Sequence, residues 1–200
     1  MKIFEGLKLD GWQVEVPGAV RNDFPEFFKE MGYRVGVEIG TYTGLYTRIL
    51  CSHGLKIYTV DPWLIYPGFL GLRHSNQERQ ERSFEKAKSR LAKYKNCTII
   101  RKTSMEAVKD FEDESIDFVY IDGNHGFKYF TEDLWEWSKK IKKGGIISGH
   151  DYRNDDIQAF VCDVKHVLDG YIKAAKIPKW YILGKEGEGD RDRSWFFLKT

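Results

Sequence analysis

The sequence predicts a doubly wound α/β fold with a mainly parallel, seven-stranded sheet that finishes in a C-terminal antiparallel β-hairpin. Between residues 34 and 168, short runs of β-branched and aromatic residues alternate with segments of helical period. Such alternation is typical of parallel strands joined by right-handed helical crossovers, with helices on both faces of the sheet. Two aromatic runs at 180–183 and 195–198, joined by a charged, glycine-rich turn, break the alternation and predict the hairpin.

Each predicted strand is a short apolar run, and several end at a glycine or an aspartate, which are uncommon inside strands. In chain order the runs are RVGVEI (34–39), KIYTV (56–60), TIIR (98–101), IDFVYI (116–121), GIIS (145–148), WYIL (180–183) and WFFL (195–198). Gly40, Asp61 and Asp122 directly follow three of them. These three positions therefore mark where strands end and loops begin.

Helices are predicted where apolar residues recur every three or four positions. The longest stripes cover 77–94 and 127–142, and three shorter helices are expected beside them. The apolar positions are Leu45, Ile49, Leu50, Phe84, Ala87, Leu91, Tyr94, Met105, Val108, Phe127, Phe130, Leu134, Trp137, Ile141, Ile157, Phe160, Val161, Val164 and Leu168. KKGG at 142–145 is expected to end the 127–142 helix, because lysines and a glycine suit a helix C-terminus.

Composition limits the class of protein. Two hundred residues with 32 basic and 30 acidic side chains, a net charge of +2, suit one domain over residues 1–200 and do not favour a nucleic-acid partner. The three cysteines lack metal-binding spacing, which indicates a reduced, cytoplasmic protein. No secretion signal or membrane span is expected, because no run of about 18 apolar residues occurs. The segment 62–76, rich in proline and glycine, is predicted to be a lid insertion.

The strand ends are the predicted ligand site, because open α/β sheets bind ligands beyond the carboxyl ends of their strands. In EIGTYTG (38–44), Gly40 allows a sharp turn and Gly44 a close helix start. Tyr42 stands where a dinucleotide site needs its second glycine, which disfavours a pyrophosphate; a turn without any ligand stays an alternative. Asp61 suits the two hydroxyls of a ribose, although alone it could equally be a turn or helix cap.

These residues resemble the class I S-adenosylmethionine-dependent methyltransferases, and more narrowly the catechol O-methyltransferase-like and macrocin O-methyltransferase-like enzymes. The motifs that carry the resemblance are VEIGTYTG (37–44), YTVDPW (58–63), FVYIDGNHGF (118–127) and KKGGIISGHDY (142–152). The resemblance spans roughly residues 34–152, agrees with the terminal hairpin and implies a Rossmann-like fold. It further implies S-adenosylmethionine as cofactor, with methyl transfer to a small-molecule acceptor.

The resemblance also implies which residues hold the cofactor. The glycine motif would surround the methionine end and the ribose, Asp61 would take the ribose hydroxyls, and Trp63, Ser104 and Met105 would lie at the adenine. The full set of implied cofactor-binding residues is Glu38, Gly40, Thr41, Tyr42, Gly44, Asp61, Trp63, Ser104, Met105 and Asp122.

In the metal-dependent members of this group, an acid after the fourth strand and a polar pair after the fifth bind a divalent ion. Asp122, His150 and Asp151 match these positions, and His125 falls where a base would remove the acceptor proton. His150 departs from the usual carboxylate, since Mg²⁺ prefers oxygen ligands and imidazole suits Mn²⁺ or later metals. Three readings stay open: His150 is not a ligand, the ion is not magnesium, or no metal binds. His125 and Asp122 have a plainer reading as a satisfied polar group and a turn residue.

The predicted function is O-methylation of a hydroxyl on a sugar, a phenol or another metabolite, with Mg²⁺ or Mn²⁺ as a candidate cofactor. The candidate catalytic residues are His125 and Asp122, and a homodimer is a candidate assembly. The aromatic residues of 62–76 are expected to form part of an apolar acceptor pocket. The alternatives are a non-catalytic nucleotide- or S-adenosylmethionine-binding domain and an NAD(P)-dependent reductase, the latter disfavoured by Tyr42 and the terminal hairpin.

Overall fold

The structure is a computed structural model that describes residues 2–67, 69, 76–153, 162–185 and 192–200. The strands of its sheet are β1 (Gln13–Val16), β2 (Val35–Ile39), β3 (Lys56–Val60), β4 (Cys97–Ile100), β5 (Ile116–Ile121), β6 (Ile141–Tyr152), β7 (Trp180–Leu183) and β8 (Arg193–Leu198). The helices are α1 (Lys2–Leu7), α2 (Phe24–Glu30), α3 (Leu45–Ser52), α4 (Gln77–Leu91), α5 (Ser104–Ala107), α6 (Phe127–Lys140) and α7 (Val164–Ala174), with short 3₁₀ turns η1 (Arg21–Asp23) and η2 (Val108–Asp110).

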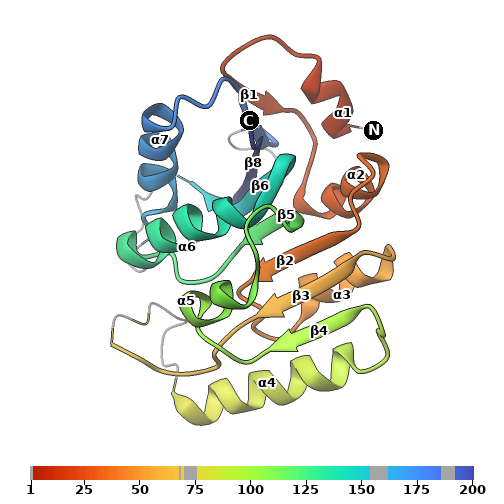
Figure 1. Ribbon diagram of the computed structural model, residues 1–200, viewed down its shortest axis with the longest axis vertical. Coiled ribbons are helices and arrows are strands. Elements are labelled where there is room, and N and C mark those ends of the chain that lie inside the picture. Colours follow the sequence, from red (N-terminus) through yellow and green to blue (C-terminus); the bar gives the residue numbers. More distant parts are fainter. Residues whose placement is uncertain (1, 68, 70–75, 154–161, 186–191) are drawn as a thin grey trace.

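The strands form one sheet in the order β1-β7-β8-β6-β5-β2-β3-β4 (Figure 1). Strand β8 lies antiparallel between β6 and β7, and every other neighbouring pair is parallel. The predicted doubly wound sheet and its terminal antiparallel hairpin are therefore confirmed. The predicted order of strands and helices along the chain is also the observed one over residues 34–152.

The sheet has eight strands in the described part of the chain, one more than the seven predicted. The additional strand is β1, which pairs in parallel with β7 so that Gln13 faces Trp180. QVEV is too short and too polar to be recognised by its period alone. Its strand conformation depends on a partner more than 160 residues away, so only the tertiary structure supplies the pairing.

Two apolar layers cover the two faces of the sheet. On one face α5, α6 and α7 pack their apolar residues, among them Phe130, Leu134 and Trp137, against the strands. On the other face, α1, α2 and α3 bury a cluster that includes Phe24 and Phe28 (Figure 1). Helix α4 packs against α3 at the β4 edge of the sheet. Removal of these large apolar side chains from water is the main force that holds the layers together.

The end of α6 differs from the prediction. Helix α6 stops at Lys140, and KKGG belongs to β6, which runs from Ile141 to Tyr152 and pairs with β5 at Ile141 and again from Ile146. The lysines and glycine suit a helix cap locally, but the residues on both sides of this stretch pair with β5, and Gly144 and Gly145 form backbone hydrogen bonds with Lys199. Gly144 takes the positive φ of 75° that the irregular start of the strand requires.

Strand β6 also ends irregularly, in a way that matters for the site. Its register with β8 shifts between Gly149 and Tyr152, and Asp151 within the shift has a φ of 58°. A bulge of this kind turns a side chain away from the regular alternation of a strand. The direction of the Asp151 side chain is therefore set by the bulge and not by the regular alternation of the strand.

Two predicted segments lie partly outside the described residues. The predicted helix around residues 157–168 is described only from 162, where α7 begins at Val164 and continues to Ala174. Of the predicted lid 62–76, residues 68 and 70–75 are outside the described part. Among the described helices, none combines the length and the apolar character that crossing a bilayer requires.

Candidate active site

A cavity of about 810 Å³ opens at the carboxyl ends of the central parallel strands. Its lining includes residues directly after β2, β3 and β5, together with Asp151 near the end of β6. Residues from α6 and from the segment between β3 and α4 complete the wall. This is the edge of the sheet where the sequence predicts the ligand site.

Gly40 makes the turn after β2 possible. Its φ is 94°, and a Cβ atom at this position would lie 1.9 Å from the carbonyl oxygen of Asp122. Both facts require glycine, since a side chain would be strained and would also overlap the backbone after β5. Tyr42 follows with a φ of 48° and is partly exposed in the cavity. The turn thus brings the ends of β2 and β5 into direct contact.

Asp61 is held in the cavity by backbone donors. The amide of Tyr42 donates to its Oδ2 at 2.8 Å, and the amide of Trp63 donates to its Oδ1 at 2.8 Å. Burial raises the pKa of Asp61, and these backbone hydrogen bonds oppose that shift. Each carboxylate oxygen keeps further lone pairs that a ligand hydroxyl could use.

Trp63 does not line the cavity. Its side chain is fully buried, lies against the ring of Phe84 at 4.9 Å and donates from Nε1 to the carbonyl oxygen of Tyr42 at 2.7 Å. Its φ of 44° adds another non-glycine residue with a left-handed backbone beside the site. Trp63 therefore holds the Tyr42 turn and Asp61 in place, and the structure does not bring it to the place predicted for an adenine.

Glu38 also lies outside the cavity, under the glycine turn. Thr47 and Thr59 both donate hydrogen bonds to its Oε2, the latter at 2.7 Å, and Thr41 bonds to Thr59 at 2.5 Å. Burial raises the pKa of Glu38 to about 8, despite the two threonine hydrogen bonds. Since strand side chains alternate between the two faces, Glu38 points away from the face on which Ile39 lines the cavity.

We expect Glu38→Gln to remove a pH dependence of stability. The pKa is about 8 in the folded protein against an ordinary 4.5. Between these values the folded state holds more protons than the unfolded state, so the free energy of unfolding falls as pH rises. Glutamine cannot ionise, so the free energy of unfolding of the wild type should fall by on the order of 3 kcal/mol relative to that of Glu38→Gln when the pH rises from 5 to 8.5. Urea unfolding at the two pH values measures this difference. An equal change in the free energy of unfolding in wild type and Glu38→Gln would contradict the prediction. Glu85→Gln on the surface of α4 is the control and should behave like the wild type.

Ser104 and Met105, at the start of α5, line the cavity beyond β4. The indole Nε1 of Trp137 donates to the Ser104 hydroxyl at 2.7 Å. Trp137 is fully buried in the core, while Trp135 is 55% exposed on the surface of α6, and neither tryptophan lines the cavity. Ser104 is thus a cavity residue whose orientation is set from α6.

Two carboxylates and two imidazoles converge at the ends of β5 and β6. The Nε2 of His125 lies 3.2 Å from Oδ2 of Asp151 and 3.5 Å from Oδ1 of Asp122. The Nδ1 of His150 lies 3.3 Å from Oδ2 of Asp151. His125 Nε2 is buried, and none of its contacts among the described residues has hydrogen-bond geometry. The predicted set of Asp122, His125, His150 and Asp151 is therefore brought together.

The charges in this cluster stabilise one another. Burial lowers the pKa of each histidine, but the carboxylates outweigh it, so that the pKa of His125 is raised and that of His150 rises to about 9. Burial alone would raise the pKa of Asp151, but the hydrogen bond and charge of His150, with the charge of His125, lower it to about 2. The carboxylates thus make both imidazoles stronger bases, and the two imidazoles stabilise the charged form of Asp151.

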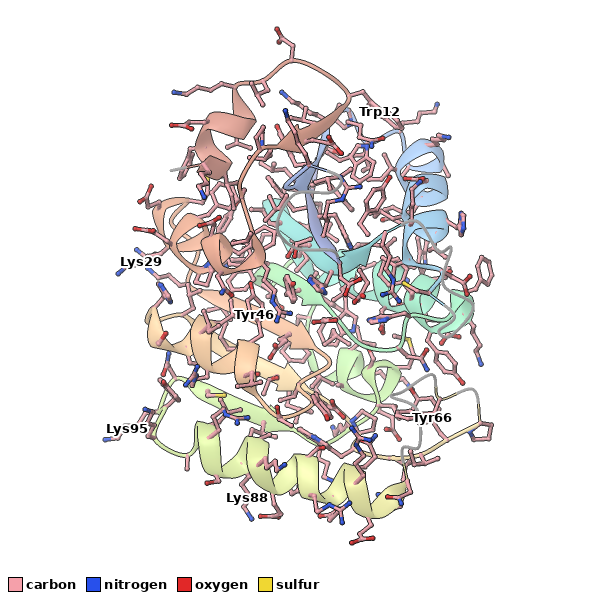
Figure 2. The ribbon with its side chains drawn as sticks, turned by 180° about the vertical axis from the view of Figure 1, so that it is seen from behind. Trp12, Lys29, Tyr46, Tyr66, Lys88 and Lys95 are labelled. Carbon is pink, nitrogen blue, oxygen red and sulfur yellow. The ribbon has the colours of Figure 1, made fainter. Side chains whose placement is uncertain are left out.

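Arg21 reaches this cluster from the N-terminal part of the chain. Its Nη1 lies 3.8 Å from Oδ2 of Asp122, and its guanidinium lies 5.3 Å from the ring centre of Tyr46. The Tyr46 hydroxyl in turn donates to the Arg21 carbonyl oxygen at 2.9 Å (Figure 2 labels Tyr46). No local pattern around Arg21 marks it as a site residue, because its position depends on how α2 and α3 pack.

Tyr66, Phe69 and Tyr129 form an aromatic wall of the cavity. Tyr66 lies on the segment between β3 and α4, on the side of the molecule where α5 and α6 are found (Figure 2). Its ring lies 5.5 Å from that of Phe69 and 5.5 Å from that of Tyr129. The amide of Asn124 donates to the Tyr66 hydroxyl at 3.1 Å, and Tyr129 donates to the Pro67 carbonyl oxygen at 2.6 Å. The described part of 62–76 is thus joined to the loop after β5 and to α6.

The predicted site residues therefore divide into two groups. The cavity lining includes Gly40, Tyr42, Asp61, Ser104, Met105, Asp122, His125 and Asp151. Residues that support this lining from outside the cavity are Glu38, Thr41, Gly44, Trp63 and His150. Gly44 caps α3 with a φ of 71°, and a Cβ there would lie 3.0 Å from a methyl group of Leu91 on α4.

Comparison with known proteins gives one family and one curated relative. The model of a family described as a methyltransferase domain matches residues 37–152. An uncharacterized protein of Sinorhizobium fredii, y4gI, is 26% identical over 124 residues, which are 58% of this chain. The chain spans only 13% of the length of that relative.

Solved structures of similar fold include enzymes with different acceptor atoms. An O-methyltransferase from Bacillus cereus, in complex with SAH, aligns with a TM-score of 0.61 at 17% identity, over 89% of this chain and 80% of its own. The O-methyltransferase TomG from Streptomyces achromogenes, in complex with SAM, gives 0.60 at 13% identity, over 90% and 79%. The N-methyltransferase NodS from Bradyrhizobium japonicum gives 0.60 at 13% identity, over 90% and 94%. At these identities the likeness concerns the fold.

Proposed function

The chain belongs to a family of methyltransferase domains, and from this premise we propose that it transfers a methyl group from S-adenosylmethionine to a hydroxyl oxygen of a small molecule. The observation that carries the proposal is the arrangement within one cavity. Asp61, a ribose-type carboxylate, lies beyond β3, and the His125 cluster lies beyond β5 and β6. A nucleoside donor needs a carboxylate such as Asp61 at one end of the cavity. An acceptor that must lose a proton needs a base such as His125 at the other.

The cavity residues fit an adenosyl cofactor without phosphates. The Gly40 turn leaves no room for a Cβ, and Asp61 is fixed by two backbone amides so that its remaining lone pairs suit two ribose hydroxyls. Tyr42 is acceptable here because no pyrophosphate must approach the backbone. S-adenosylmethionine would supply the electrophilic methyl group on its sulfonium. Two similar structures, in complex with SAH and SAM, support this choice of cofactor.

His125 is the proposed base for the acceptor hydroxyl. Its imidazole lines the cavity, and the carboxylates of Asp122 and Asp151 orient it from 3.5 and 3.2 Å. Histidine is the side chain most often used for proton transfer near neutral pH. In this arrangement the proton of the acceptor passes to the imidazole, and the two carboxylates stabilise the imidazolium that results.

The same cluster fits a divalent cation. Ligand atoms of Asp122, His150 and Asp151 lie within 4.8 Å of one another, and His125, Asp151 and Cys162 form a second such group. The first of these groups does not include His125, which can therefore serve as the base while an ion is bound. When bound, the ion would lower the pKa of the acceptor hydroxyl. The mixture of oxygen and imidazole donors favours Mn²⁺ over Mg²⁺.

We expect purified protein to bind Mn²⁺ more tightly than Mg²⁺, and Asp151→Asn to weaken Mn²⁺ binding by about 10- to 100-fold. Asparagine keeps the size of the side chain but removes the charge that attracts the cation. Isothermal calorimetry after treatment with EDTA measures both affinities, and Asp169→Asn on α7 is the control. Equal Mn²⁺ affinity in wild type and Asp151→Asn would contradict the proposed ligand, and turnover unaffected by EDTA would exclude a catalytic metal.

The acceptor pocket is proposed to lie between the cluster and the aromatic wall. Leu64, Tyr66, Phe69 and Tyr129 contribute apolar surface to the cavity, while Arg153 contributes a charged group that pairs with Asp192 at 2.8 Å. Such a wall suits a flat or partly apolar small molecule, for example a phenol or a sugar with an apolar aglycone. The volume of the cavity, about 810 Å³, suits a small metabolite as acceptor.

Two measurements test the function. Calorimetry should detect S-adenosylhomocysteine binding and no NADH binding, and the reverse result would support the reductase alternative. A screen of phenols, glycosides and nucleotide sugars with labelled S-adenosylmethionine should then identify the acceptor, with and without Mn²⁺ and Mg²⁺. Binding of the cofactor without transfer to any acceptor class would favour the non-catalytic alternative.

A further inference from the structure

Asp133 on α6 is a buried carboxyl group that the proposed reaction does not use. The residue is 4% exposed, yet it contributes to the cavity lining. A buried carboxyl group is costly unless hydrogen bonds satisfy it. Its presence among the buried apolar residues Phe130, Leu134 and Trp137 of the helix therefore requires an explanation.

The protein itself provides Asp133 with little hydrogen bonding. Ser104 is its one hydrogen-bonding neighbour among the described residues, and Ser104 is in turn held by the indole of Trp137. Burial raises the pKa of Asp133 to about 7. Gly123 lies beside the carboxyl group, since a Cβ at that glycine would be 3.6 Å from Oδ2. The absence of a side chain at Gly123 leaves space next to an oxygen that has unused lone pairs.

The position of Asp133 within the cavity indicates which part of a ligand it meets. The reacting groups, His125 and Asp151, lie at the ends of β5 and β6, while Asp61 and Ser104 follow β3 and β4 on the other side of β2. A nucleoside with its ribose on Asp61 and its reactive end toward His125 must direct its base away from His125. Asp133 is next to Ser104, in that second half of the cavity.

We propose that Asp133 recognises the adenine base of the cofactor, its carboxyl oxygen accepting a hydrogen bond from the exocyclic 6-amino group. The inference rests on the proposed function and assigns the base-specific contact to a residue of α6. Ser104 and Trp137 act as positioning residues, because the Trp137–Ser104 hydrogen bond holds the Asp133 carboxyl group in one orientation. A carboxyl oxygen selects an amino group, since it has no comparable interaction with a C–H at the same position.

The test compares S-adenosylhomocysteine with its analogue whose purine lacks the 6-amino group. Wild-type protein should bind S-adenosylhomocysteine about 10- to 100-fold more tightly than the analogue. In Asp133→Leu, which is similar in size and suits a buried helix position, the two affinities should agree within about threefold. Asp133→Asn keeps an acceptor oxygen and should retain the preference. Calorimetry gives all affinities, and thermal unfolding verifies that each variant is folded.

Glu136→Leu, on the exposed side of the same helix, is the matched control and should keep the wild-type preference. If wild type prefers S-adenosylhomocysteine and Asp133→Leu keeps that preference, the assignment of Asp133 is wrong while the proposed function stands. Equal binding of the two compounds by wild type would also overturn it. If wild type binds neither compound, the proposed function fails together with this inference.

Discussion

Replacing His125 with alanine should lower kcat for methyl transfer by about 100- to 10 000-fold, the usual contribution of a positioned general base. The imidazole is the cavity group closest to both carboxylates, and its Nε2 lies within 3.5 Å of Asp122 and Asp151. Alanine would leave both carboxylates in place but remove the group that takes the proton. Affinity for S-adenosylhomocysteine should change by less than about fivefold, because the proposed nucleoside contacts come from other residues.

The measurement is steady-state kinetics with the acceptor found in the screen, together with calorimetry for the cofactor product. His166→Ala provides the matched control, since that histidine is exposed on α7, outside the cavity lining. A His125→Ala enzyme that keeps at least about half of the wild-type kcat would exclude His125 as the base. A loss of both kcat and S-adenosylhomocysteine affinity would instead indicate a damaged site.

Replacing Gly40 with alanine should destabilise the protein by about 3 to 5 kcal/mol and weaken S-adenosylhomocysteine binding by at least about 100-fold. Two costs add: the backbone must keep a φ of 94°, and the new Cβ would stand 1.9 Å from the Asp122 carbonyl oxygen. The overlap can be relieved only by separating the loops after β2 and β5. Since both loops line the cavity, the site would lose its shape.

Urea unfolding and calorimetry measure the two effects of Gly40→Ala. Gly54 offers a matched control, because it has a similar φ of 83° but no atom lies within 4 Å of the position that its Cβ would take. Gly54→Ala should therefore cost only about 1 to 2 kcal/mol, the strain of the backbone alone. If the two alanine variants were equally stable, the close approach of Gly40 to Asp122 would not exist in solution.

The elements that the sequence predicted well are those with a strong local period. Phe130, Leu134 and Trp137 recur at helical spacing, and α6 buries all three, although Phe127 of the same predicted stripe is 67% exposed. IDFVYI is a continuous apolar run, and all six residues of β5 are buried. Such patterns record which face of a segment leaves water, and burial of that face is a large part of the energy of folding.

The errors and omissions occur where a distant partner decides the conformation. KKGG suits a helix end by composition, but the pairing of Ile141 and Ile146 with β5 and the hydrogen bonds of its glycines to Lys199 make it part of a strand. QVEV becomes β1 because β7 lies beside it. Glu38 is directed away from the cavity by the alternation of β2, a signal that the apolar run VGVEI already contained.

Asp133 and Arg21 differ in how far the sequence could have identified them as site residues. Asp133 had a readable signal, since a carboxylate within the apolar stripe of a predicted helix needs a partner. Arg21 had none, because its distance to Asp122 depends on the packing of the N-terminal segment against α3. Neither residue belongs to a motif that comparison of short sequence stretches would detect.

By itself the sequence determined the doubly wound sheet, its terminal hairpin and the strand ends at which Gly40, Asp61 and Asp122 stand, whereas Asp151, predicted to follow a strand over 145–148, lies within β6. These features follow from local periodicity and from the rule that parallel strands present their carboxyl ends at one edge. Only the tertiary structure decided which other side chains enter the cavity: His125 between two carboxylates, Asp133 beside Ser104, and Trp63 turned away. The reason is physical, since side-chain direction depends on bulges, left-handed residues and packing partners that lie far apart in the chain.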